Sequence, residues 1–235
     1  MTPPVLPPAY SFAMVERGRD PLAHARRRLV SGVEDGLLLL EDRTDRLELA
    51  LTLEPDRDRA GSLLVLPVLA VAVADTLAAL LPPLLPVTLG WPGRVLVDGA
   101  LVGRLRLALP PGPAAERPAW LLLGVSLDIA GPAVEPGREP GRLGLSETGC
   151  TELDPARLAE ALSRHFLSWL DRFDTEGSEP VRASWNARCH DRGRRARLVI
   201  AGQEWLGTVG GLERDGTFRL GEARLSLEAA LPELA

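Results

Sequence analysis

The sequence predicts an α+β fold: a mixed, mostly antiparallel sheet covered by helices, followed by a small β-barrel of about five strands. Before residue 190, segments with helical apolar spacing lie between segments in which apolar and polar residues alternate. Beyond His190, short β-like segments separated by glycine turns replace the helices. We therefore predict two domains, residues 1–191 and 192–235.

The composition of the chain excludes several classes of function. Its 235 residues include 27 basic and 32 acidic side chains, a formal net charge of −5, and every basic residue is arginine. The absence of lysine removes any mechanism that needs an ε-amino group, and the charge argues against nucleic-acid binding. Two cysteines form no disulfide framework, and we see no secretory signal. We expect a cytoplasmic protein with no DNA or membrane partner.

The N-terminal elements are predicted from prolines and from alternation. Four prolines in the first ten residues predict an extended arm. Asp20 and Pro21 combine a helix cap with a first-turn proline, and Gly32 closes the short amphipathic helix that follows. Residues 36–41 predict a buried strand. Residues 47–54 alternate leucine with other types, which predicts a strand with one covered face.

The stretch 63–85 is apolar enough to resemble a membrane span. It contains Asp75, Pro67 and the pair Pro82 and Pro83. A lipid-facing helix would therefore place a carboxylate and unpaired backbone groups in hydrocarbon. We predict a buried core helix that ends at the proline pair.

The middle of the chain predicts a hairpin, another strand and a long loop. Residues 95–97 and 101–109 flank an Asp-Gly turn at 98–99, which tolerates the positive φ angles of a tight hairpin. Residues 120–129 predict a further strand. Residues 130–149 are rich in proline and glycine and predict an irregular surface loop.

A cap-type residue followed by proline occurs again at 154–155 and at 179–180. The first pair predicts a helix with apolar spacing to Phe173, and the second predicts a short helix to about Cys189. The small domain is predicted to contain strands at 197–201, 204–209, 217–220 and 222–227.

Several short segments carry a resemblance to a known family. Residues 90–103, which run Gly-Trp-Pro-Gly-Arg-Val-Leu-Val-Asp-Gly-Ala-Leu-Val-Gly, are similar to a Lys-Trp-Pro-Asn-Asp signature followed by Lys-x-x-Gly. Residues 124–129, Gly-Val-Ser-Leu-Asp-Ile, are similar to a Gly-x-Gly-x-Asn-Val strand. Glu176-Gly177, Trp185 and the segment 197–200 follow in matching order. Over nearly its whole length the chain resembles the biotin protein ligases and the related lipoate ligases.

The resemblance implies a catalytic domain of the biotin/lipoate ligase type and an SH3-like C-terminal β-barrel. It implies that a carboxylic cofactor (biotin, lipoate or octanoate) is joined to a carrier-protein lysine through an acyl-adenylate made from ATP. DNA-binding members carry a winged helix before this domain, whereas here the catalytic-type domain starts almost at once. The matched motifs imply ligand-binding residues at Trp91, Gly103, Arg104, Gly124, Ser126 and Asp128.

The chain departs from the family pattern at the catalytic positions. The glycine- and arginine-rich loop that covers the adenylate is missing between residues 36 and 47. The lysine of Lys-x-x-Gly falls on Ala100 and the leading lysine falls on Gly90. The Asn-Asp pair falls on Gly93 and Arg94. Since one lost donor at a developing charge costs on the order of 3 kcal/mol, we expect conventional adenylate formation to be crippled.

Arginines offer one replacement for the missing lysine. Arg104 lies beside the matched Gly103, and Arg43 or Arg46 is placed to reach the same sheet face. The alternative is that Arg104 and Arg106 point to solvent from the polar face of their strand.

The matched strands also predict how the pocket is built. We expect Gly103, Gly124 and Ser126 to line one cavity, with the glycines leaving space for a ligand to approach the backbone. Asp128 stands where the family motif has asparagine. We expect its charge to repel phosphate unless an arginine such as Arg104 or Arg106 pairs with it.

The remaining candidates have simpler explanations. The histidines, His24, His165 and His190, lack metal-ligand spacing, so no metal site is expected. Cys150 could serve as an acyl-carrying nucleophile, as in octanoyl transferases, but those pair it with a lysine; we expect a free thiol. The arginines between 188 and 197 most simply solvate the linker, with an acidic partner or nucleotide phosphates as the alternative.

Three classes of function remain. The first is a divergent biotin or lipoate protein ligase. The second is a catalytically degenerate member that acts as a non-enzymatic module and binds a small molecule or a carrier protein. The third, an acyl transferase without ATP, is the weakest because no lysine is present.

Overall fold

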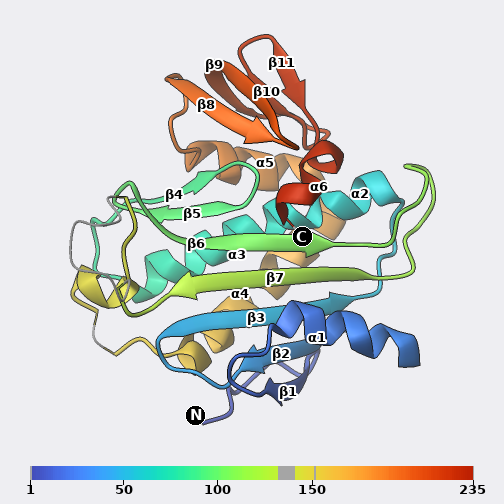
Figure 1. The fold of residues 1–235 in the computed structure, drawn as a ribbon, viewed down its shortest axis with the longest axis vertical. Helices are drawn as coiled ribbons and strands as arrows, with labels where there is room; N and C mark the ends of the chain where they lie inside the picture. Colours follow the sequence, from blue (N-terminus) through green and yellow to red (C-terminus); the bar gives the residue numbers. More distant parts are fainter. Residues whose placement is uncertain (1, 132–140, 151, 235) are drawn as a thin grey trace.

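The computed structural model describes residues 2–131, 141–150 and 152–234, which form one large and one small sheet (Figure 1). The large sheet has seven strands in the order β1-β2-β3-β7-β6-β5-β4. Its one parallel pair is β1 with β2, so the predicted mixed, mostly antiparallel sheet is confirmed. The strands are β1 (Ser11–Val15), β2 (Leu37–Glu41), β3 (Arg46–Leu53), β4 (Val87–Gly90), β5 (Arg94–Val97), β6 (Ala100–Ala108) and β7 (Leu121–Asp128).

Two long helices cover one face of this sheet, and this face is called the core face. They are α3 (Val65–Leu80), preceded by α2 (Arg59–Leu63), and α4 (Pro155–Glu176). Figure 1 shows both lying behind β6, β7 and β3. The segment Arg59–Leu80 is long and apolar enough to cross a membrane, yet 72% of its most apolar window is buried inside the fold. The predicted core helix is therefore confirmed.

The opposite face of the sheet is covered only in part, by α1 (Pro21–Arg28), which lies in front of the strands in Figure 1. The Asp20 side chain caps this helix by accepting a hydrogen bond from the backbone N–H of Leu22, as predicted. Under α1, Ala50 and Leu122 pack in a second apolar cluster. The expectation of a single covered face for β3 was therefore wrong there, because α1 buries its other side too.

The C-terminal region forms a second sheet after α5 (Ser178–Ala187). It has four antiparallel strands in the order β11-β10-β9-β8, rather than the predicted five or so. The chain after Leu225 turns into α6 (Leu227–Leu234) and adds no further strand. The strands are β8 (Arg195–Ile200), β9 (Gln203–Leu212), β10 (Phe218–Leu220) and β11 (Ala223–Leu225).

Several boundaries differ from the sequence prediction. Strands β1 and β4 and helix α6 were not predicted, and α5 begins at Ser178 after Gly177, so Glu179 lies in its first turn and does not cap it. The predicted loop 130–149 contains a 3₁₀ turn, Leu145–Thr148, and its residues 132–140 lie outside the described residues. The Asp98-Gly99 hairpin is confirmed, with φ angles of 49° and 77°.

Candidate functional site

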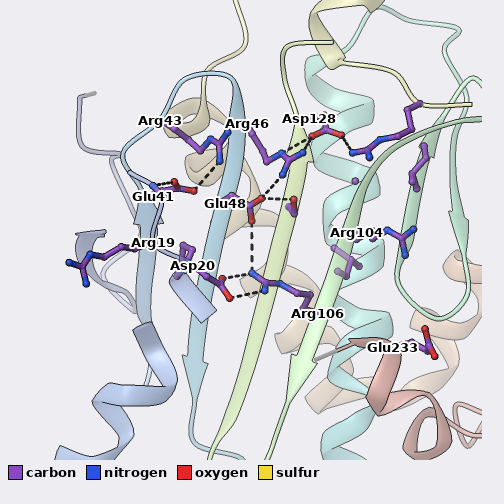
Figure 2. Close-up of a pocket in the computed structure, with 17 residues that line it drawn as sticks. Arg19, Asp20, Glu41, Arg43, Arg46, Glu48, Arg104, Arg106, Asp128 and Glu233 are labelled. Atoms are coloured by element: carbon purple, nitrogen blue, oxygen red, sulfur yellow. Dashed lines mark hydrogen bonds and ion pairs between the residues drawn. The ribbon is translucent and has the colours of Figure 1, made fainter. Parts of the chain in front are cut away.

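A cavity of about 570 Å³ opens on the part of the sheet that α1 leaves uncovered. Its walls come from β3, β6 and β7, from the turn before α1 and from the end of α6. We call it the sheet-face cavity (Figure 2). Among the described residues its lining includes six arginines and five carboxylates: Arg19, Arg43, Arg46, Arg104, Arg106 and Arg142, with Asp20, Glu41, Glu48, Asp128 and Glu233.

Strand register brings these charges together. Glu48 on β3 and Arg104 on β6 both lie opposite Ser126 on β7, and Arg46 lies opposite Asp128. Cross-strand neighbours project from the same face of a sheet, so residues distant in sequence form one polar surface. The leucines between them, such as Leu47 and Leu49, point to the core face.

Six of these side chains form a continuous row of alternating charges, which we call the ion-pair chain (Figure 2). Asp128 is held from two sides: its carboxylate lies 2.6 Å from Arg46 Nη2 and 2.8 Å from Arg142 Nη2. Glu48 lies 3.3 Å from Arg46 Nη1 and 3.9 Å from Arg106 Nη2. The row is Arg142, Asp128, Arg46, Glu48, Arg106 and Asp20.

Glu48 is the centre of the ion-pair chain and is the most enclosed of its acids, with a side chain 13% exposed. Ser126 Oγ donates a 2.7 Å hydrogen bond to Glu48 Oε1. Burial raises the pKa of Glu48 above its usual range, and the pull of Ser126, Arg46 and Arg106 in the other direction offsets this only in part. Glu48 therefore carries a desolvation cost that its hydrogen bond and ion pairs offset only in part.

Asp20 closes the far end of the ion-pair chain. Its Oδ1 lies 2.6 Å from Arg106 Nη2 and also accepts the capping hydrogen bond from Leu22. Burial acts to raise the pKa of Asp20, but the hydrogen bond and charge of Arg106 and the helix N–H groups hold it below its usual value. One carboxylate thus anchors both the helix start and the cavity wall.

A short turn between β2 and β3 stands where the family pattern has its adenylate-covering loop. Within this turn, Arg43 Nη2 lies 2.7 Å from Asp45, and Arg43 Nη1 lies 3.3 Å from Glu41. Glu41, only 3% exposed, also accepts a hydrogen bond from the Gly18 N–H. Arg43 is thereby fixed to its own turn.

The structure places most of the predicted ligand-binding residues in this cavity. Gly103, Arg104, Ser126 and Asp128 line it, as do the candidate arginines Arg43, Arg46 and Arg106. Gly124 and Trp91 are absent from the described lining. Asp128 is paired, but with Arg46 and Arg142, so the expected partners Arg104 and Arg106 were wrong. Nor does Arg106 project freely into solvent, since it binds Asp20.

The two matched glycines have a different role from the predicted one. A Cβ atom on Gly103 would lie 2.1 Å from the backbone oxygen of Ser126, so this glycine permits close approach of β6 and β7. A Cβ atom on Gly124 would lie 3.0 Å from Cβ of Arg106, so this glycine makes room for that arginine. Neither position leaves open space for a ligand.

Trp91 is a core residue of the junction between the two sheets. It is 2% exposed and stacks on Phe218 of β10, with ring centroids 5.1 Å apart. It also borders a smaller groove beside the sheet-face cavity. Ala100, at the position of the family lysine, opens β6 one residue before Leu101, which lines the cavity.

The other sequence candidates form no second centre. The residues described hold no group of three or more His, Cys, Asp or Glu side chains that could bind a metal ion. Cys150 and Cys189 are free thiols, and burial raises the pKa of Cys189 to about 11. The predicted arginine cluster is dispersed, because Arg188 pairs with Asp75 and Arg197 pairs with Glu204.

Three members of the ion-pair chain were missed from the sequence: Asp20, Glu48 and Arg142. Asp20 was interpreted only as a helix cap, and Glu48 only as a polar position of a half-buried strand. A signal existed for Glu48, because Glu48, Arg106 and Ser126 occupy alternating positions of predicted strands. The pairing of those strands, which makes them neighbours, is long-range and is not encoded in local pattern.

Comparisons with known proteins agree on one family. Residues 6–187 match the biotin/lipoate A/B protein ligase family. A biotin–[acetyl-CoA-carboxylase] ligase of Paracoccus denitrificans is 31% identical over 156 residues, which are 64% of this chain. That match spans 60% of the length of the Paracoccus ligase.

Solved structures extend the likeness to the whole fold. A biotin protein ligase-like protein of unknown function from Silicibacter sp. TM1040 has a TM-score of 0.86 at 31% identity, covering 97% of this chain and 98% of that one. Biotin protein ligase from Aquifex aeolicus has a TM-score of 0.75 at 18% identity, covering 92% and 95%. The Aquifex ligase is also known in complex with biotin and ATP, with a TM-score of 0.69.

Proposed function

The chain belongs to the biotin/lipoate A/B protein ligase family, and we propose that it binds a small carboxylic ligand in the sheet-face cavity without activating it as an adenylate. This is the catalytically degenerate, binding-module hypothesis. The observation that carries it is the ion-pair chain, whose closed row of charges occupies the cavity floor.

The charge balance of the cavity supports this proposal over a nucleotide-activating site. Its described lining has one more arginine than carboxylates. Enzymes that transfer phosphoryl groups stabilise the phosphates with arginine, lysine and Mg²⁺, so such a site needs a clear excess of positive charge. Here five carboxylates line the same space, and their negative charge would repel an incoming triphosphate.

The arginines are also poorly available to replace the missing lysine. Arg46, Arg106 and Arg43 each hold a carboxylate at 2.6 to 2.7 Å. Redirecting one of them to a reacting phosphate would leave a partly buried carboxylate without its partner, which is costly. Arg104 is the one arginine of the floor strands that makes no ion pair among the described residues. Arg104 is therefore available to bind one carboxylate group of a ligand.

The lining also favours a particular kind of carboxylic ligand. The Aquifex ligase has been solved with biotin, the family description adds lipoate, and octanoate is the third acid that the sequence resemblance implies. Ser126, Glu48 and the arginines offer hydrogen-bond donors and acceptors, and Leu101 and Leu105 add some apolar surface to the lining. It therefore favours a carboxylate with a polar head, such as biotin, over an aliphatic acid such as octanoate.

Equilibrium binding of biotin, lipoate and octanoate, measured by calorimetry with and without ATP, tests the proposal. We expect the parent protein to bind at least biotin, with the same affinity in both conditions. A Ser126→Leu protein, in which a larger side chain fills the floor, should lose this binding. Arg172→Gln, on the exposed surface of α4, serves as the control and should retain it. The proposal is overturned if none of the three acids binds, or if ATP strengthens binding tenfold or more.

A further inference from the structure

Two arginines lie side by side at the edge of the sheet-face cavity. Arg94 on β5 is the direct cross-strand neighbour of Arg104 on β6. The same row continues to Gly90 on one side and to Ser126 on the other. All four positions therefore face the same side of the sheet. We call Arg94 and Arg104 the arginine pair.

The arginine pair lacks the neutralisation that the rest of the cavity has. Neither guanidinium makes a hydrogen bond or an ion pair within the described part of the chain. Like charges directly opposite each other on a sheet are destabilising. Burial, together with the nearby charge of Arg104, lowers the pKa of Arg94, and Asp191 opposes this only from a distance. Arg104 is exposed and Arg94 is half-buried, so solvent screens part of this repulsion, and a bound anion would relieve the rest.

Gly90 shapes the space for this arrangement. A Cβ atom on Gly90 would lie 3.0 Å from Nε and 3.1 Å from Nη2 of Arg94. The guanidinium therefore lies across the glycine, and a larger residue at position 90 would push it away. Gly90 and Arg94 are two of the positions at which this chain departs from the family motif, so the departures form one structural unit.

A groove of about 200 Å³ lies beside the arginine pair, between β5, β6 and the strand β8. Arg104, Leu105 and Glu233 line both this groove and the sheet-face cavity. The other charged groups of the groove are already engaged: Arg197 with Glu204 at 2.7 Å, and Glu233 with the N–H of Ala201 at 3.1 Å. An N–H donor does not neutralise Glu233, so beyond the Arg197–Glu204 pair the described lining of the groove holds two arginines against one carboxylate, which is a net positive charge.

We propose that Arg94 and Arg104 together form an oxyanion-binding subsite, which takes a carboxylate or phosphate group between their two guanidiniums. Guanidinium groups bind such oxyanions through paired N–H donors, so two neighbouring arginines provide a specific cradle. The subsite stands independently of any cavity ligand. The further step, that it holds the acidic end of a ligand reaching in from the sheet-face cavity, rests on the proposed function.

Thermal unfolding in acetate or inorganic phosphate, with sodium chloride adjusted to constant ionic strength, tests this subsite. We expect the Tm of the parent protein to rise with anion concentration, as mass action requires for a ligand that binds the folded state. The larger response, to acetate or to phosphate, identifies the preferred group. Arg94→Gln and Arg104→Gln should each weaken the response roughly tenfold. Arg172→Gln, on the exposed surface of α4 and outside the groove, should respond like the parent.

A second readout separates a binding role from a merely structural one. Without added anion, Arg94→Gln should be at least as stable as the parent, because it removes the repulsion within the pair. The subsite is overturned if the parent shows no anion response, if the Gln variants respond like the parent, or if Arg94→Gln is markedly less stable without anion. Loss of biotin binding with the anion response intact would refute the proposed function and leave the subsite standing.

Discussion

The two faces of the large sheet carry side chains with different roles, packing on one face and ion pairing on the other. On the core face, leucines of β3, β6 and β7 pack under α3 and α4 and are almost completely buried. On the opposite face, beyond the N-terminal end of α1, alternate positions of the same strands carry most of the ion-pair chain. Adjacent residues therefore have different roles: Leu47 packs in the hydrophobic core, and Glu48 belongs to the ion-pair chain.

This difference shows that the packing of the core face does not depend on which side chains the open face carries. Alternation along a strand gives each face its own residues, so one face can be rebuilt while the other keeps its packing. Here the core face retains an apolar interior, and the open face lacks the family's lysines and covering loop. Substitutions on the core face should therefore lower stability more than substitutions on the open face.

The largest loss should come from the core face. Leu123 is fully buried opposite Leu107 and Leu51, and Leu123→Ala should lower the free energy of unfolding by about 4 kcal/mol through lost contacts and a residual cavity. Urea unfolding measures it. Leu206→Ala, at a site 62% exposed, is the control and should change stability by less than about 0.5 kcal/mol. Similar losses in both variants would contradict the account of the core face.

The second prediction compares the two matched glycines. Gly103→Ala should cost about 3 kcal/mol, because its Cβ meets the backbone of β7 and the two strands must separate. Gly124→Ala should cost only about 1 kcal/mol, since its Cβ would lie 3.0 Å from Cβ of Arg106 and a small shift of that residue relieves the contact. Urea unfolding of both variants gives the difference. Equal costs, or a larger cost at Gly124, would show that the glycines do not play these separate roles.

The third prediction concerns the open face and restores a family residue. Asp128→Asn should destabilise the protein by about 1 to 2 kcal/mol, because Arg46 and Arg142 both lose their shared carboxylate in a partly solvated site. In a matched control, Glu204→Gln breaks an exposed pair with Arg197 and should cost less than about 0.5 kcal/mol. An Asp128→Asn protein as stable as the parent would mean that the ion-pair chain is incidental to stability.

The smallest effect is a pH dependence at Glu48. Its folded pKa is raised by burial above an unfolded value of about 4.3, so the folded state binds the proton more readily. As pH falls through the raised folded pKa towards the unfolded value, the parent should therefore gain stability relative to Glu48→Gln. Asp20, whose pKa is lowered, loses its contribution only below about pH 3.9 and does not interfere. A stability difference that is constant over this range, or that moves in the opposite direction, would contradict the desolvation of Glu48.

Local pattern was sufficient for most of the fold. The cap-plus-proline pairs at Asp20 and Asp154 do begin helices, and the alternating leucines do form β3 and β6. Strands β1 and β4 were not predicted because they are short edge strands with little alternation of apolar and polar residues. Helix α6 escaped because Pro232 lies within it, and proline normally argues against a helix.

The candidate site was less accessible to sequence reasoning than the fold. Motif resemblance located Gly103, Arg104, Ser126 and Asp128 at the cavity because these residues lie on the central strands. It could not give the partner of Asp128, since Arg46 and Arg142 reach it only through strand pairing and loop placement. Nor could it show that glycine at 124 serves an arginine, because that depends on which strand lies opposite.

We propose that this chain forms no acyl-adenylate, because most arginines of its cavity are held in ion pairs and the family's lysines are absent. ATP–pyrophosphate exchange with biotin, lipoate and octanoate tests it most directly, with a conventional biotin protein ligase run in parallel. We predict no exchange above background for the parent with any of the three acids, and at most a slight rise for Ala100→Lys, because one ammonium alone does not restore the missing set of donors. Robust exchange by the parent would contradict the claim and show that its arginines perform the work of the missing lysine.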